Sequence, residues 1–313
     1  MRFLLISLVF AIGALFIFFA FSTETESPAV SPSETASLSM PAPGAPPEPE
    51  MEKPETPAAE MNVINPAVQT GETLIVQFNK EPRSAILNGK TIAVFPYQND
   101  FRAIVPIPLG TKTGTSSIAA EFANGGHFEK TIAVKSGKAK TIVLPPPPKL
   151  GMTDKQIVQN LATVNQVVRK TVEEAADITR FNEPFGLPLY DNRKISSAFG
   201  EVRQTGSERI THLGVDFDNP KGRMVAAINA GLVKSAYLDP IYGNTVIVDH
   251  GRGVYSLYMH MNTMKVKDGD IVKKGTILGT VGDTGLASAP HLHLSIKING
   301  VSVDPIQFVS AFR

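Results

Sequence analysis

Four histidines and one aspartate after residue 200 have the types and spacing of a metal site. They stand in three short segments: His212-Leu213-Gly214-Val215-Asp216, Leu257-Tyr258-Met259-His260 and Pro290-His291-Leu292-His293-Leu294. The third segment is apolar and strand-like, so its two-residue period puts both imidazoles on one face of a sheet, about 7 Å apart. From this spacing alone, either both imidazoles bind a metal, or one binds it and the other acts beside it.

The segment from His212 to Asp216 adds an imidazole and a carboxylate four residues apart. Both groups suit zinc, and Gly214 permits a tight backbone between them. This H-x-x-x-D pattern is common by itself, but together with H-x-H it supplies the three protein ligands of a catalytic zinc site and leaves a position for water. The chain has no cysteine, which excludes disulfides, a cysteine nucleophile, a thiolate ligand and a lipidated cysteine anchor.

A long apolar run at the start of the chain predicts export of everything that follows. Residues 3–21 carry no charge and approach the length needed to cross the hydrocarbon core of a membrane. We predict that residues 1–22 are a signal anchor, with a cleaved signal peptide as the alternative. The chain would then be held by residues 3–21 on the outer side of the cytoplasmic membrane, or lie in the periplasmic or cell-wall space. Residues 23–60, rich in Pro, Glu and Ser, are predicted to be a disordered linker.

Short β-branched runs separated by turn residues predict a small antiparallel β-sandwich over residues 61–146. The predicted strands are 73–78, 91–95, 102–105, 117–122, 130–134 and 140–144. The lone His127 in this region is predicted to be structural or solvated. Residues 150–188 are predicted to be a helical connector, because Thr153 and Gln156 form a capping box and apolar residues recur at helical spacing.

Residues 195–309 resemble the catalytic domain of the lysostaphin-type (LytM-like) zinc metallopeptidases. The similar stretches, in that family's order, are Ser197–Gly200, His212–Asp216, Tyr242–Gly251, Tyr258–His260, Val266–Gly275, Gly282–Gly285 and His291–His293. The resemblance implies a compact, mostly antiparallel β domain with an open groove, which we place at residues 189–313. The predicted fold class of the chain is therefore mainly β.

The resemblance also implies roles for the site residues. His212, Asp216 and His293 would hold one zinc ion per chain, and His260 and His291 would be the unliganded catalytic pair. Zinc lowers the pKa of bound water toward 7, so the expected reaction is peptide-bond hydrolysis in which the two histidines stabilise charge and move protons. The expected function is a zinc endopeptidase that cleaves peptidoglycan crosslinks or stem peptides during cell-wall remodelling.

Two other functions fit parts of the sequence. Some relatives of this family have lost their metal ligands and activate other wall hydrolases, so a non-catalytic activator or scaffold is the alternative, although every expected ligand is present here. Residues 269–275 and Lys265 also resemble the hairpin of biotinyl and lipoyl carrier domains, but a carrier does not need these histidines. The balance of 30 basic and 29 acidic residues gives no reason to expect a nucleic-acid partner.

Several neighbouring residues receive weaker predictions. In enzymes of this family an upstream segment can occlude the groove, so residues 61–190 are a candidate autoinhibitory segment. His250 is expected to be structural in a turn, and Tyr258 and Asn244 are expected to serve packing or turns. Asp218 follows Asp216 on the same strand face, which favours a supporting role beside the metal ligands.

Overall fold

The computed structural model describes residues 58–123, 125–137, 141–143, 151–173, 176–191, 194–205 and 208–312. The predicted signal anchor or signal peptide, and all of the predicted linker except residues 58–60, lie outside these ranges. No helix within the described ranges is long and apolar enough to cross a membrane. This part of the chain is mainly β, as predicted, and its helices are α1 (Asp154–Val172) and α2 (Pro305–Ala311).

Two sheets pack face to face near the start of the described chain. One contains, in order, β1 (Met61–Val63), β3 (Thr73–Phe78), β7 (Asp100–Pro106) and β6 (Phe95–Tyr97). The other contains β2 (Ala67–Gln69), β9 (His127–Lys135), β8 (Gly114–Glu121), β4 (Ser84–Leu87) and β5 (Lys90–Thr91). Neighbouring strands are antiparallel except β2 and β9, which are parallel. Alternate residues such as Val76, Ile118 and Ile132 fill the core between the sheets.

Two predicted strands of this sandwich differ from the structure. The run 91–95 is divided between β5 and β6, which belong to different sheets, so the chain crosses from one sheet to the other at residues 92–94. The last run, β10 (Thr141–Val143), pairs in parallel with β12 (Val202–Thr205), and β12 pairs with β13 (Glu208–Thr211). Strand-forming residues specify an extended backbone but not its neighbour, which explains both errors.

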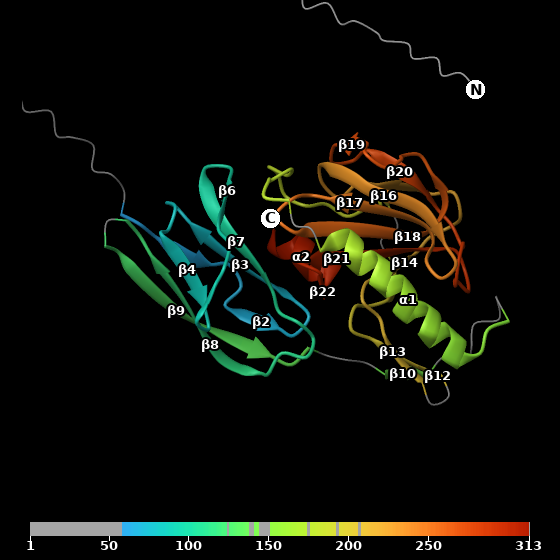
Figure 1. Cartoon of the computed structure of the whole chain (residues 1–313), viewed down its shortest axis with the longest axis horizontal. Helices are drawn as coiled ribbons and strands as arrows, with labels where there is room; N and C mark the ends of the chain where they lie inside the picture. The colour runs from blue at the N-terminus through green and yellow to red at the C-terminus, as the bar shows by residue number, and fades with distance from the viewer. Residues whose placement is uncertain are drawn as a thin grey trace, which may run out of the picture. The chain divides into compact units, whose positions relative to one another are not determined.

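Helix α1 begins where its capping box predicts. The Thr153 side chain accepts from Gln156 N, and the Gln156 side chain accepts from Thr153 N at 2.8 Å. One face of the helix, formed by Val164, Val168 and Val172, packs with Tyr255, Leu257 and Met259 of the large C-terminal sheet (Figure 1). The helix is shorter than the predicted connector, because residues 176–191 form no helix.

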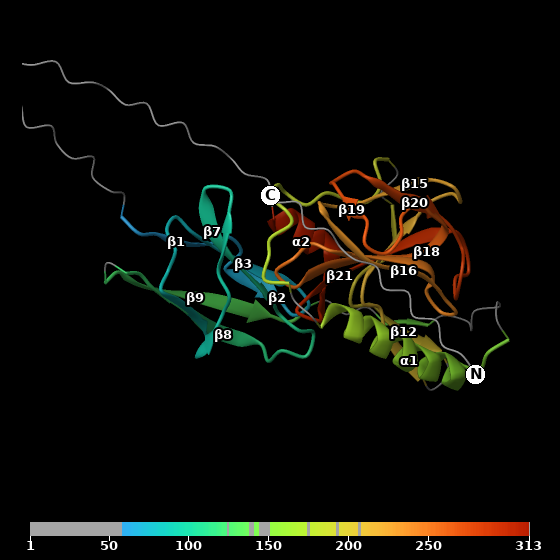
Figure 2. The same ribbon diagram turned by 45° about the horizontal axis from the view of Figure 1, so that its top comes forward.

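The C-terminal domain is built on a ten-stranded sheet. Its path runs β11 (Ile195–Ser197), β14 (Val215–Asp218), β21 (His291–Ile298), β18 (Val254–Met264), β17 (Gly243–Asp249), β16 (Gly231–Asp239) and β19 (Ile271–Val272). Beside this path lie β15 (Met224–Ala226), β20 (Ile277–Val281) and β22 (Val301–Val303). Figure 2 shows β18, β16 and β21 together, with α1 below them in this view. The sheet face that carries Tyr258, Leu294 and Ile296 is part of the largest buried hydrophobic cluster.

The sandwich and the C-terminal domain share that hydrophobic cluster. The ring of Tyr97 in β6 lies 5.9 Å from Phe181 and 5.2 Å from Phe312, centroid to centroid. The backbone of Thr73 in β3 also forms two hydrogen bonds with the side-chain amide of Gln307 in α2. Thr73 N donates to Gln307 Oε1 at 2.8 Å, and Gln307 Nε2 donates to Thr73 O at 3.0 Å. These contacts join two segments that the sequence presents as separate domains.

His250 is a core residue, in agreement with its predicted structural role. It is 0% exposed, and its ring bonds to Ala230 O through Nδ1 at 2.7 Å and to Ser256 Oγ through Nε2 at 2.8 Å. Burial lowers the pKa of His250 to about 4. The neutral imidazole is therefore the form that the fold accommodates.

Acidification should destabilise the chain through His250. Above pH 6.5 the ring is neutral in both states, whereas between pH 6.5 and 4 only the unfolded state gains a proton, so stability falls with pH. The pKa of about 4 corresponds to a loss of about 3 kcal/mol in the free energy of unfolding. Urea unfolding in the presence of a chelator measures the free energy of unfolding at pH 7.5 and at pH 4. The decrease between these two pH values should be smaller in His250→Gln than in the unsubstituted chain. The same pH dependence in both proteins would remove His250 from this explanation.

Candidate metal centre

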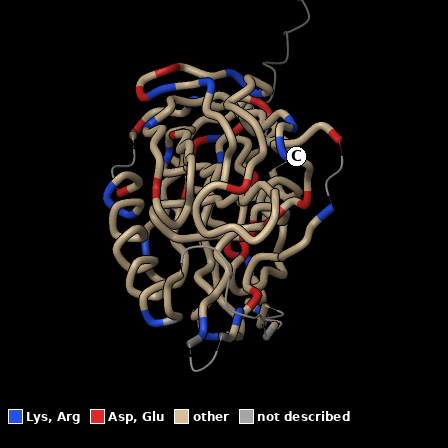
Figure 3. Tube along the Cα trace, turned by 90° about the vertical axis from the view of Figure 1, so that its right-hand side faces the viewer, with Lys and Arg blue, Asp and Glu red and all other residues tan. Residues whose placement is uncertain are grey.

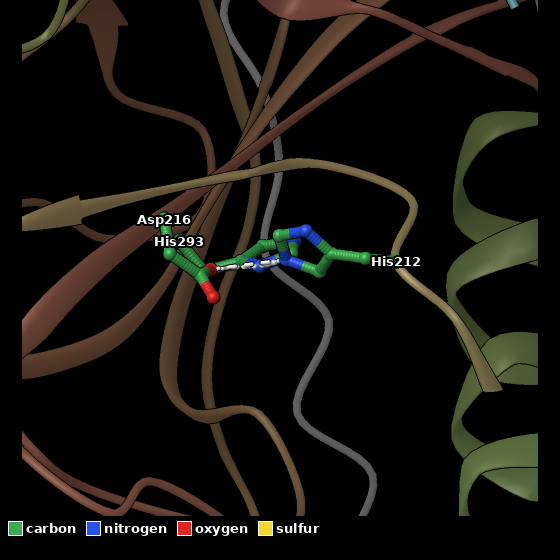
Figure 4. Close-up of side chains that lie close together, drawn as sticks. All are labelled: His212, Asp216 and His293. Atoms are coloured by element: carbon green, nitrogen blue, oxygen red, sulfur yellow. Dashed lines mark hydrogen bonds and ion pairs between the residues drawn. The ribbon is translucent and has the colours of Figure 1, made fainter. Parts of the chain in front are cut away.

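Three side chains converge where β14 and β21 pair. Asp216 Oδ1 lies 3.1 Å from His212 Nε2 and 2.8 Å from His293 Nδ1, and the two nitrogens are 3.0 Å apart. Their side chains are only 5–11% exposed. Figure 4 shows His212 reaching from its loop toward the other two residues, which lie on adjacent strands. The structure thus brings together the three predicted ligands.

Strand register and one glycine produce this convergence. Asp216 is paired directly with His293, so the two side chains project from the same face of the sheet. His212 lies in the loop before β14, and this loop rests on β21 at Gly214. A Cβ atom at position 214 would come within 2.4 Å of His293 Nε2 and 2.5 Å of Leu294 O. Only glycine permits this close approach.

Hydrogen bonds behind the site fix which nitrogen of His212 and of His293 carries the lone pair. His212 Nδ1 lies 2.9 Å from Ala198 O, which only accepts, so Nδ1–H donates and Nε2 keeps its lone pair. Ser295 Oγ donates to Leu213 O at 2.8 Å, so it accepts from His293 Nε2–H at 2.9 Å. His293 therefore presents the lone pair of Nδ1 to the centre. Burial lowers the pKa of His293 to about 4, although Asp216 acts in the opposite direction. The ring is therefore neutral at pH 7.

Arg203 holds the second oxygen of the aspartate. Its guanidinium donates from one nitrogen to Asp216 Oδ2 at 2.6 Å and to Ser197 Oγ at 2.9 Å. Oδ1 is thereby the oxygen that faces the histidines. Burial alone would raise the pKa of Asp216, but the adjoining imidazoles of His212 and His293 lower it well below its usual range. The carboxylate is ionised at neutral pH.

His260 and His291 form a second pair beside the three converging residues. Their ring centroids are 4.7 Å apart, and His291 Nε2 lies 3.8 Å from Asp216 Oδ1. His260 Nδ1 donates to Thr284 O at 2.9 Å and His291 Nδ1 donates to Ala289 O at 2.8 Å. In its neutral form, each ring consequently keeps the lone pair on Nε2. Burial, followed by the charges of His291 and His293, lowers the pKa of His260 to about 3.

His260 reaches this position through an unusual backbone conformation. Met259 is paired with His293, so regular alternation would turn the next side chain to the opposite face of the sheet. Instead, His260 has φ of 59°, beside a register shift in the pairing of β17 and β18. This left-handed conformation is unfavourable for a residue with a Cβ and is typical of functional sites.

Comparison with known proteins places this site in a family. The model of peptidase family M23 matches residues 210–305, which contain all five site residues. A crystal structure from Pseudomonas aeruginosa that is assigned to peptidase M23 covers 78% of this chain and 95% of its own, with 28% identity and a TM-score of 0.57. Residues 210–305 therefore carry a peptidase M23 domain. The resemblance noted in the sequence is confirmed.

Two curated relatives resemble a shorter part of this chain, around the M23 domain. An uncharacterised metalloprotease of Haemophilus influenzae is 40% identical over 123 residues, which are 38% of this chain and 26% of the relative. Peptidoglycan DD-endopeptidase ShyC of Vibrio cholerae is 34% identical over 118 residues, 37% of this chain and 27% of the relative. The chain thus spans about a quarter of the length of these relatives. Their names agree with the predicted class of metallo-endopeptidases.

The donor set of the M23 domain fits a metal ion. Two imidazole lone pairs and one carboxylate oxygen face one another at about 3 Å, and the assigned tautomers leave no hydrogen between them. Such an arrangement is unfavourable by itself and is stabilised by a cation. The ligand atoms of a tetrahedral zinc site lie about 3.3 Å apart, close to these separations. His212, Asp216 and His293 could therefore hold one metal ion.

The supporting residues of the M23 site were largely missed in the sequence. Arg203 and Ser197 contact Asp216 or His212 from positions that no spacing rule singles out. Ser295 had a signal, because it follows His291 and His293 on the same strand face. Asp218, predicted to support the ligands, forms an ion pair with Lys194 at 2.9 Å. Tyr258 accepts from Ile228 N in the core and Asn244 donates to Met261 O, as their predicted structural roles require.

Arg203→Gln should weaken divalent-metal affinity about 10–100-fold, because residues that orient a metal ligand typically contribute that much. The substitution removes the donor that holds Asp216 Oδ2, so the carboxylate can turn away from the histidines. Competition with a chromophoric chelator measures the affinity directly. Arg209→Gln is the matched control, since Arg209 is an exposed residue on the neighbouring strand β13. Equal affinities of the two variants would exclude an orienting role for Arg203.

Proposed function

We propose that this chain is a zinc-dependent endopeptidase that hydrolyses peptide bonds in peptidoglycan crosslinks or stem peptides. The observation that carries the proposal is the convergence of His212 Nε2, Asp216 Oδ1 and His293 Nδ1, with His260 and His291 beside them. A carrier domain or a purely structural β domain has no use for this arrangement. A non-catalytic activator would not need both the complete donor set and the second histidine pair.

The five side chains divide into two roles in this proposal. His212, Asp216 and His293 would hold the zinc ion, which would supply a Lewis acid and an activated water for hydrolysis of a peptide bond. His260 and His291 present Nε2 toward the reacting groups. There the lone pair of one ring accepts a proton from water, and the Nε2–H that forms hydrogen-bonds the developing oxyanion and returns the proton to the leaving amine. We assign these last tasks to the pair jointly. The low pKa of His260, about 3, keeps that ring a neutral base at pH 7.

Peptidoglycan is proposed as the substrate because of the named relative in Vibrio cholerae, a peptidoglycan DD-endopeptidase. A wall substrate requires export, which agrees with the apolar run at residues 3–21. We propose that the chain acts on the outer side of the cytoplasmic membrane, either anchored by that run or released after its cleavage. Remodelling of the cell's own wall is the role most consistent with an anchor and a short spacer.

The full chain tests the proposal when it is incubated with purified peptidoglycan and the released fragments are analysed by mass spectrometry. New amino termini should appear within crosslinks or stem peptides, and a chelator should abolish them until zinc is restored. Release of no fragment by the zinc-loaded chain would contradict the endopeptidase. The activator or scaffold alternative would gain support if the chain instead increased the rate of an added wall hydrolase.

Autoinhibition by residues 61–190 stays a prediction. Among the described residues, the hydrogen-bond partners of the five site residues lie between Ser197 and Ser295, in the C-terminal domain. Helix α1 nevertheless packs on the same sheet beside the site. Val168→Asp, which loosens that packing, should raise turnover of wall fragments if the segment blocks the groove. Unchanged or lower turnover would exclude the block.

A further inference from the structure

A second candidate site lies between helix α1 and the sheet that carries the metal centre. A cavity of about 370 Å³ is lined by Arg169 and Asn165 of α1, by Lys297 at the end of β21, by Leu213, and by the β22 residues near Ser302. This volume falls in the range of small-ligand sites. Leu213 follows the proposed ligand His212, so the cavity adjoins the metal centre without belonging to it.

The cavity is positively charged. Its described lining residues include Arg169 and Lys297 but no Asp or Glu. Along the trace as a whole, basic and acidic residues are interspersed (Figure 3). Lys297 Nζ donates to Ser302 Oγ at 2.7 Å, and neither cation lies within ion-pair distance of a carboxylate among the described residues. Burial, then the charge of Arg169, lowers the pKa of Lys297 to about 8. A bound anion would relieve this repulsion.

Asn165 adds a further donor at the wall of the cavity. Its Oδ1 accepts from the Tyr242 hydroxyl at 2.8 Å, so its Nδ2 group is the part left to donate. Two cations and an amide donor, with no Asp or Glu among the lining residues, are the groups that recognise a carboxylate. Apolar residues such as Leu109 and Leu213 complete the lining and would contact a carbon skeleton.

Strand β21 relates the cavity to the metal centre. His293, Ser295 and Lys297 are two residues apart in β21 and therefore lie on the same face of the strand. Lys297 is four residues beyond the proposed ligand His293, which is about 13 Å along the strand. The loop at Leu213 crosses this face between them, where Ser295 Oγ donates to Leu213 O. A wall peptide of about four extended residues covers such a distance.

We propose that the Arg169–Lys297 cavity binds a free carboxylate group of the wall peptide, and that it selects carboxylate-bearing over amidated peptides. This inference rests on the proposed function for the identity of the peptide. Binding of a carboxylate in the cavity does not depend on hydrolysis, so the proposed binding site and the proposed hydrolase can be disproved separately.

Binding to the full chain without metal tests the cavity independently of hydrolysis. The probes are acetyl-D-alanyl-D-alanine with a free carboxyl terminus, the same peptide as its carboxyl-terminal amide, and acetate, each titrated calorimetrically in chelator. The free acid should bind at least about tenfold more tightly than the amide, because a hydrogen bond to a charged group contributes at least that factor. Acetate should bind more weakly than the peptide acid. Equal affinities for acid and amide, or acetate as tight as the peptide acid, would overturn the proposal.

Substitutions then locate the effect. Arg169→Gln and Lys297→Gln should each remove most of the preference for the acid, while Lys297→Arg should keep it. Lys170→Gln is the matched control, since Lys170 is exposed on the same turn of α1 and does not line the cavity. Arg169 is also exposed, so its variant should fold. An undiminished preference in both Arg169→Gln and Lys297→Gln would overturn the assignment. Retained preference in a chain that releases no wall fragments would instead defeat only the proposed hydrolase.

Discussion

Asp216→Ala should lose the bound zinc and lower the release of wall fragments at least about 10³-fold. The carboxylate is the single negative group among the three that converge, and its Oδ1 lies within 3.1 Å of His212 Nε2 and His293 Nδ1. Loss of the ion would remove several kcal/mol of transition-state stabilisation, and each 1.4 kcal/mol corresponds to a factor of ten. Metal analysis of the purified variant and fragment release from peptidoglycan measure the two effects.

Asp218→Ala is the matched control for this substitution. Asp218 lies two residues farther along β14, and its ion pair with Lys194 is exposed to solvent. This variant should keep one zinc ion per chain and most of its activity. Because Asp216→Ala leaves Arg203 without its carboxylate partner, folding should be checked by circular dichroism. Stoichiometric zinc in a folded Asp216→Ala protein would contradict the assigned ligand set.

His260→Ala and His291→Ala should show the opposite combination, with zinc retained and turnover reduced about 10²–10⁴-fold, the range for loss of a general acid or base. Neither ring belongs to the three side chains that converge at the centre. Each ring is oriented by a hydrogen bond from Nδ1 to a backbone carbonyl. Zinc content and single-turnover rates on a soluble wall peptide separate binding from chemistry.

Loss of zinc from a histidine variant would be most informative for His291. Its Nε2 lies 3.8 Å from Asp216 Oδ1, near enough for a small rotation to make it a ligand. Loss of zinc in His291→Ala would therefore move His291 into the metal set. His127→Ala, on the exposed start of β9, is the control and should leave both zinc content and rate unchanged.

Local patterns predicted much of this molecule. The capping box of Thr153 and Gln156 gave the start of α1, and alternation in H-x-H correctly put His291 and His293 on one face. Gly214 was singled out as permitting a tight backbone, whereas in the structure it permits close contact with His293 and Leu294. These features depend on neighbouring residues in the chain, where propensity and side-chain period act directly. The choice between His291 and His293 as ligand came only from family resemblance.

Features that depend on distant residues were not predictable. The pairing of Asp216 with His293 joins residues far apart in sequence, and the left-handed backbone at His260 reflects the register shift beside it. Arg203 reaches Asp216 from a strand whose partners include β10, which the sequence assigned to the sandwich. Tertiary packing selects such neighbours, and no short sequence pattern encodes them.

Diffraction from zinc-loaded crystals, recorded on both sides of the zinc absorption edge, locates the ion directly. We expect a single anomalous peak per chain, about 2.0–2.2 Å from His212 Nε2, Asp216 Oδ1 and His293 Nδ1. A peak bound to other residues, or no peak from a fully zinc-loaded protein, would contradict the metal centre and with it the proposed hydrolase.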